Sequence, residues 1–116
     1  MEQEELMALA EGWKAATDHV LSDESIDRKV LSNLFQDTYL LIKKYSANSM
    51  IPRELYQVLW EMNDFHWWVI QSEETPIHFL CQDITSLVVD FNYFVVRGWT
   101  NELDIRYLIA KIEGEV

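Results

Sequence analysis

The sequence predicts an all-α fold: a single domain over residues 1–116, built as an up-and-down bundle of four to five helices. Three observations lead to this prediction. With only 3 Gly and 2 Pro, and no alternating apolar pattern between turn dipeptides, the chain lacks the turn residues that β architectures need. Apolar residues recur at helical spacing instead. Hydrophobic residues make up 49% of the chain, which is enough for one core.

The first two helices are predicted over residues 3–21 and 25–47. Acidic residues fill the first turn of the first helix, where the helix dipole favours them. The turn at residues 22–25 is expected to supply the N-cap of the second helix. The apolar stripe of the first helix is Leu6, Leu9, Trp13, Ala16 and Val20. That of the second is Val30, Leu34, Thr38, Leu41 and Tyr45, with Leu31, Phe35 and Ile42 beside it.

A third helix is predicted from Ile51-Pro52 to Ser72, because proline is accommodated in a first helical turn. Its core stripe is Leu55, Val58, Leu59, Met62, Phe65 and Val69. The run Glu73-Glu74-Thr75-Pro76 combines a turn, a cap candidate and a first-turn proline. We therefore expect the third helix to end there and a fourth to begin.

The fourth helix is predicted over residues 76–97 and is the most apolar, as a central helix usually is. Its β-branched pair Val88-Val89 leaves a strand as the minor alternative for part of this segment. Its apolar residues are Ile77, Leu80, Cys81, Ile84, Leu87, Val88, Phe91 and Val95. Gly98 should end it, and a short fifth helix should follow over residues 100–112. The inward side chains of that helix are Leu103, Tyr107 and Leu108.

The charge of the chain is strongly negative and unevenly spread. Nine Lys and Arg against 20 Asp and Glu give −11 with histidine neutral. This balance disfavours nucleic acids and anionic membranes as partners, and makes a basic protein the natural complement; solubility is the alternative explanation. Residues 28–53 form the one basic region, with five basic residues against Asp37, which gives +4. That region either pairs with neighbouring helices or meets an acidic face of another copy.

The cysteine count, the first residues and the longest apolar stretch indicate the cellular compartment that we expect. The single Cys81 excludes an intramolecular disulfide and favours a reducing compartment. The sequence Met1-Glu2-Gln3-Glu4-Glu5 is acidic where a signal peptide would be basic. The stretch from Ile84 to Val96 is interrupted by polar residues and is too short to span a bilayer. We expect a cytoplasmic protein that has no membrane segment.

No catalytic or cofactor signature is present, so the sequence predicts no enzyme, no cofactor and no metal site. The helical spacing of di-iron bundles, Glu-x-x-His, is missing. His78 and Cys81 lie one turn apart, yet two ligands without a third or fourth are a weak signal. No Gly-x-Ser-x-Gly elbow or phosphate-binding loop occurs. A bundle cavity with His66 or His78 as its polar group, binding a small ligand or metal, stays an alternative.

An aromatic stripe with interleaved carboxylates is the most informative feature. Tyr and Trp are the residues most often found as interface anchors, and Arg can stack on indole while it pairs with a carboxylate. The predicted partner-binding residues of the third helix are Tyr56, Trp60, Glu61, Asp64 and Trp67. Those of the fourth are Asp83, Asp90 and Tyr93. In an antiparallel hairpin, residues near 64 lie roughly level with residues near 84, which makes Asp64 and Asp83 candidate neighbours. In the competing interpretation the third helix lies between two neighbours and both of its stripes are core.

The leading hypothesis is a non-enzymatic acidic module that binds a basic protein. In size and composition the chain resembles bacterial immunity proteins and other inhibitors that cover a basic toxin or nuclease, a resemblance without residue correspondence. A third hypothesis, beside the small-ligand or metal-binding bundle, is a self-associating subunit such as a homodimer.

Overall fold

The computed structural model describes residues 2–22, 27–45, 51–71, 84–86, 88–89 and 91–92. They contain three helices: α1 (Glu2–Leu21), α2 (Arg28–Tyr45) and α3 (Arg53–Gln71). The described residues between 84 and 92, here called the fourth segment, are helical as well, and no described residue is in a strand. The predicted all-α bundle is confirmed. The predicted fifth helix lies outside the described residues, and a single domain over the whole chain stays a prediction.

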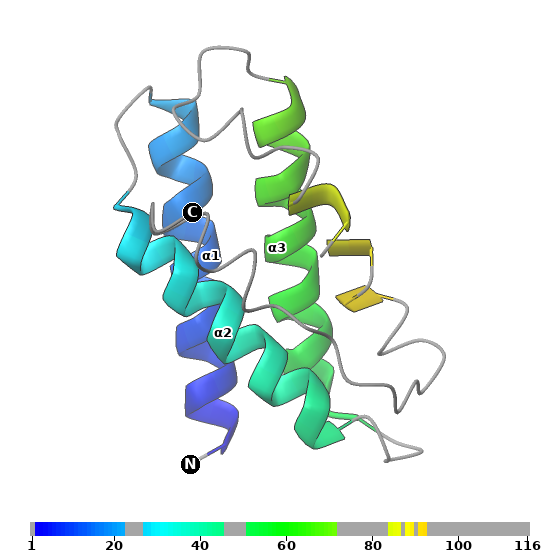
Figure 1. Ribbon diagram of the computed structural model, residues 1–116. Coiled ribbons are helices and arrows are strands. Elements are labelled where there is room, and N and C mark those ends of the chain that lie inside the picture. The colour runs from blue at the N-terminus through cyan, green and yellow to red at the C-terminus, as the bar shows by residue number, and fades with distance from the viewer. Residues whose placement is uncertain are drawn as a thin grey trace.

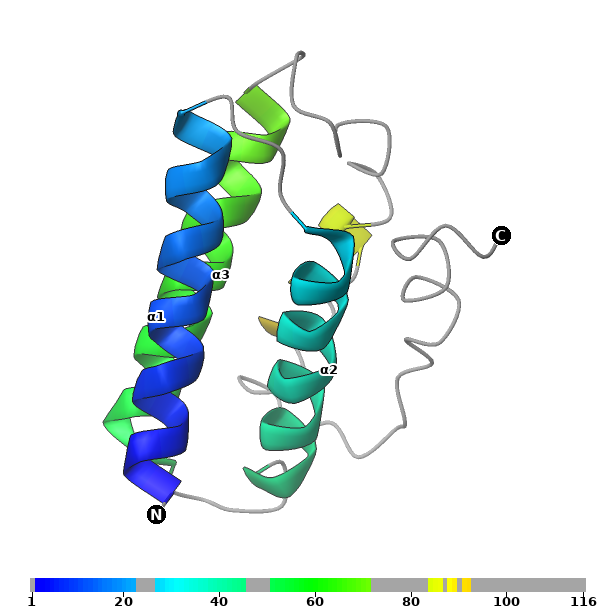
Figure 2. The ribbon, with the colours of Figure 1, turned by 90° about the vertical axis from the view of Figure 1, so that its left-hand side faces the viewer.

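Consecutive helices alternate in direction, so α1 and α3 run parallel to each other (Figure 1). A hydrogen bond of 3.0 Å from Gln3 Nε2 to Glu54 Oε1 joins the first turns of α1 and α3 and places their N-termini at the same end of the bundle. Figure 2 shows α1 and α3 side by side, with α2 on one side of this pair. α1 packs mainly against α3 and much less against α2.

Trp13 is the side chain that joins α1 to its two neighbours. It is fully buried, and its ring centroid lies 4.9 Å from that of Phe35 on α2 and 5.2 Å from that of Phe65 on α3. The indole Nε1 donates a 2.9 Å hydrogen bond to Thr38 Oγ1, which itself donates to the Leu34 carbonyl at 2.7 Å. The buried indole N–H of Trp13 and the buried hydroxyl of Thr38 are thus both paired, as such groups require.

The core stripes of α1 and α3 are the predicted ones, and every residue in them is buried. In the fourth segment the three buried side chains, Ile84, Val88 and Phe91, were all predicted as apolar helix positions. The centroid of the Phe91 ring lies 6.4 Å from that of Phe35, which attaches this segment to α2. The strand alternative at Val88-Val89 is wrong, because both residues are helical.

Two predictions about α2 are wrong in detail. The helix begins at Arg28, and its cap is Asp27, whose Oδ1 accepts a 2.8 Å hydrogen bond from the Lys29 backbone N–H. The predicted start at residue 25 is too early, because the N-cap was expected from the turn at residues 22–25. Val30 is 49% exposed and Leu41 only partly buried, because the buried face is turned toward the stripe that begins at Leu31.

Candidate partner-binding site

Four residues form a row on the side of α3 that faces away from the core: Tyr56, Trp60, Asp64 and Trp67. We call this row the α3 outer face. The spacing of three and four residues puts them on one side of the helix, and the three aromatic side chains are 56%, 70% and 54% exposed. The interpretation in which both stripes of this helix are core is therefore wrong.

The α3 outer face is hollowed between its two indoles. Trp60, Asn63, Asp64 and Trp67 line an open depression of about 230 Å³. The depression is bounded by aromatic rings and a carboxylate, and Asn63 adds an amide. An arginine side chain fits this chemistry, because its planar guanidinium stacks on indole and pairs with a carboxylate.

Carboxylates gather at the edge of α3 that faces α1. Burial raises the pKa of the Glu61 carboxyl above its ordinary value, and the negative charge of Asp64 raises it further. Lys14 lowers this pKa, whereas Glu11 and Asp18 raise it. We call these four acidic residues the α1/α3 acidic cluster. Within the cluster the repulsion of Glu61 by its neighbours outweighs the attraction of Lys14, so an added cation would be favoured here.

Replacing Glu61 with glutamine should stabilise the fold at neutral pH, by about 0.5 kcal/mol on the scale of exposed charge pairs. Because the folded-state pKa of Glu61 is raised, its stabilising contribution is complete below its ordinary pKa and is lost as the pH rises through the raised value. The gain of Glu61→Gln should therefore be present at pH 7 and vanish near pH 4. Urea unfolding at both pH values measures it. Glu4→Gln removes an exposed charge of α1 as the matched control, and equal gains in both variants would contradict the prediction.

The opposite edge of α3 is held to the fourth segment by polar side chains. Asn63 and Asn92 exchange two amide hydrogen bonds, of 3.2 and 3.0 Å between Nδ2 and Oδ1. Each amide nitrogen also donates at 2.7 Å to the carbonyl four residues earlier on its own helix. One turn further along α3, a 2.7 Å hydrogen bond joins His66 Nε2 to Thr85 Oγ1. These contacts fix the rotation of α3 and so keep the outer face turned outward.

The half-buried His66 of this edge makes stability depend on pH. Burial lowers the pKa of the His66 imidazole below its ordinary value, because the charged form loses hydration. Between the lowered value and about 6.5 the unfolded chain binds more protons, so stability should fall as the pH drops through this window. The slope contributed by this residue cannot exceed about 1.4 kcal/mol per pH unit.

Chemical unfolding of wild type and His66→Gln between pH 5 and 7.5 tests this dependence. The variant should show a shallower slope than wild type. His19→Gln, at an exposed histidine of α1, shows how far the loss of any histidine changes the slope. A His66→Gln slope equal to that of wild type would contradict the assignment.

The predicted site residues fall into two groups. The structure brings Tyr56, Trp60, Asp64 and Trp67 to the outer face and Glu61 to its α1 edge, while Asp83, Asp90 and Tyr93 lie outside the described residues. The expected antiparallel pairing is close to the observed one, since His66 contacts Thr85. Asp64 lies between Asn63 and His66, whose partners are Asn92 and Thr85, so it is level with the stretch between Thr85 and Asn92, slightly beyond residue 84.

Sequence reasoning missed the contribution of α1 to this surface. Glu11, Lys14 and Asp18 lie near Glu61 only because α1 and α3 are direct neighbours, and no local pattern indicates which helices of a bundle touch. Asn63 was missed too, although its position three residues after Trp60 and one before Asp64 places it on the border of the same face.

Other kinds of site are not visible in the described part of the chain. No three His, Cys, Asp or Glu side chains there come close enough together to hold a metal ion. His78 and Cys81 lie outside the described residues. None of the helices that the structure describes is long and apolar enough to cross a membrane.

Comparisons with known proteins give no relative: no protein-family model, no curated protein and no solved structure matches the chain. The function proposed next is therefore based on the residues and contacts of this chain alone.

Proposed function

We propose that this protein is a non-enzymatic binding module that docks a basic protein through the α3 outer face. One observation carries the proposal: three large aromatic side chains are more than half exposed in a single row, with Asp64 between two of them. An exposed aromatic row of this kind marks an interaction surface more often than a scattered exposed leucine does.

Trp and Tyr supply most of the energy in many protein interfaces, since each covers a large area and retains a polar group. Trp60 and Trp67 would act as the anchors of the docked partner. The indole of Trp60 is the most exposed large hydrophobic side chain among those described. Transfer of this indole from water into an interface would provide the main favourable contribution to the free energy of binding.

The carboxylates determine the charge of the partner that binds. Asp64 lines the depression between the indoles. Glu61 lies at the α1 edge of the α3 outer face, in the α1/α3 acidic cluster. A partner that presents Arg or Lys relieves their mutual repulsion, while an acidic partner increases it. The net charge of −11 adds long-range attraction that speeds the encounter.

A small acidic protein that covers a basic partner is suited to inhibition. We propose that the partner is a basic toxin or nuclease, and that the protein neutralises it in the manner of a bacterial immunity protein in the cytoplasm. Residues Asp83, Asp90 and Tyr93 stay proposed members of the same surface.

A capture experiment with paired baits tests the proposal. Immobilised wild-type protein should retain a basic protein from an extract of the source cells, and Asp64→Lys should retain about tenfold less, because one ion pair is lost and a repulsion is added. Asp37→Lys makes the same charge change on the exposed surface of α2 and should retain the wild-type amount. Equal losses with both variants would show that only net charge matters and would exclude the α3 outer face.

A further inference from the structure

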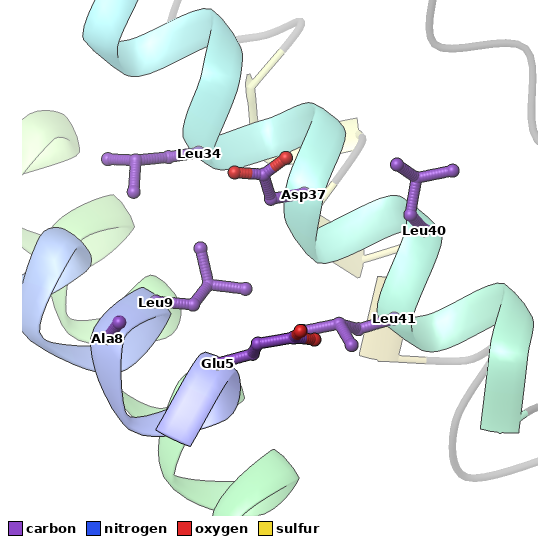
Figure 3. A pocket seen from close by; sticks show the side chains of 7 residues that line it. All are labelled: Glu5, Ala8, Leu9, Leu34, Asp37, Leu40 and Leu41. Carbon is purple, nitrogen blue, oxygen red and sulfur yellow. The ribbon is translucent and has the colours of Figure 1, made fainter. Parts of the chain in front are cut away.

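A second concave surface lies between α1 and α2, and none of its lining residues belongs to α3. The two helices approach closely at Gly12, where an added Cβ would lie 2.7 Å from Leu34 Cδ2. Toward the N-terminus of α1 and the C-terminus of α2 they leave a groove of about 480 Å³ (Figure 3). Its lining residues are Glu5, Ala8, Leu9, Leu34, Asp37, Leu40 and Leu41.

The groove combines an apolar floor with two acidic walls. Leu9 and Leu34 form the floor and belong to the core, whereas Leu40 at the margin is 61% exposed. Figure 3 shows the carboxylates of Glu5, from α1, and Asp37, from α2, on the two sides of the groove. No lining residue is basic. A ligand in this groove would therefore meet negative charge from two helices and an apolar surface between them.

We propose that the α1/α2 groove binds a small organic cation, namely a protonated amine attached to an apolar body. Its volume falls within the ~300–1,000 Å³ of typical ligand pockets, and such pockets are mostly apolar with a few polar groups that orient the ligand. The apolar body covers Leu9 and Leu34, and the ammonium lies between the carboxylates of Glu5 and Asp37. The same carboxylates repel an anionic ligand of equal shape.

Three probes of nearly equal shape separate charge from apolar contact: 4-phenylbutylamine, 4-phenylbutanol and 4-phenylbutyrate. Each is titrated at pH 7 into the full chain carrying ¹³C-labelled methyl groups, and binding is followed on the methyl signals of Ala8, Leu9 and Leu34. The amine should bind about fivefold more tightly than the alcohol, on the scale of an exposed ion pair, and the carboxylate most weakly.

Matched variants locate the binding to the groove. The double variant Glu5→Gln/Asp37→Asn should reduce the affinity for the amine to that for the alcohol, while Glu4→Gln, at an exposed residue of α1 that does not line the groove, should leave it unchanged. Asp64→Lys should also leave it unchanged, which separates this site from the proposed partner surface.

Three outcomes would overturn the inference. The first is equal affinity for the three probes, and the second is an amine preference that survives in the double variant. The third is a set of shifts centred on Trp60 and Trp67 with none on the groove methyls, which would assign the amine to the α3 outer face. The partner-binding proposal would stand in each case.

Discussion

Replacing Trp13 with alanine is expected to lower the free energy of unfolding by about 3–5 kcal/mol, the range for removal of a large buried aromatic side chain. Trp13 is fully buried, and its ring contacts Phe35 on α2 and Phe65 on α3. Removing it leaves a cavity where three helices meet, and also leaves Thr38 Oγ1 without the indole donor. Urea unfolding followed by circular dichroism measures the change.

A second variant separates the hydrogen bond from the packing. Thr38→Val keeps the shape of the side chain and leaves the indole N–H of Trp13 buried without its acceptor, at an expected cost of about 1–3 kcal/mol. If the two changes act through one contact, the double variant should cost less than the sum of the single ones. Strict additivity, or a Trp13→Ala effect below about 1 kcal/mol, would contradict the assigned core.

The double variant Trp60→Ala/Trp67→Ala is expected to weaken binding of the captured partner at least about 30-fold, which corresponds to about 2 kcal/mol, the loss of a single strong interface anchor. Both indoles are more than half exposed, so each change should alter the free energy of unfolding by only about 0.5 kcal/mol. Calorimetric titration of the purified partner measures the affinity, and thermal unfolding measures the stability.

A matched control for this double variant exists on other helices. Leu21 and Leu40 are 51% and 61% exposed, so Leu21→Ala/Leu40→Ala removes a comparable kind of exposed apolar surface away from α3. That variant should bind the partner as wild type does. An intact affinity in Trp60→Ala/Trp67→Ala would place the interface elsewhere, and a large loss of stability would mean that the two indoles serve the fold.

The fold could be predicted from local spacing because the core residues of α1 and of α3 recur at regular helical spacing. The start of α2 could not, since several polar residues precede it and only the hydrogen bond from Lys29 N–H identifies Asp27 as the cap. Val30 was predicted on the buried stripe but is exposed, and the cause is similar. Two neighbouring apolar stripes on α2 leave its rotation ambiguous until Trp13 packs against Phe35.

Only part of the candidate site could be predicted from the sequence. Helical spacing alone puts Trp60, Asp64 and Trp67 in one row, but tryptophan suits a core and an interface equally well. Only the packing of α3 against α1 and the fourth segment decides that this row is exposed. The acidic cluster around Glu61 depends on the parallel pairing of α1 and α3, which connects residues far apart in sequence.

The most direct test of the central claim uses the indole N–H signals of the five tryptophans. In a ¹⁵N spectrum titrated with a nona-arginine peptide, the signals of Trp60 and Trp67 should shift, and these shifts should disappear at high salt and in Asp64→Lys. The signal of Trp13, which is fully buried and bonded to Thr38, serves as the internal reference and should stay in place. Unmoved Trp60 and Trp67 signals, or shifts that persist in Asp64→Lys, would contradict the claim that the α3 outer face binds a basic partner.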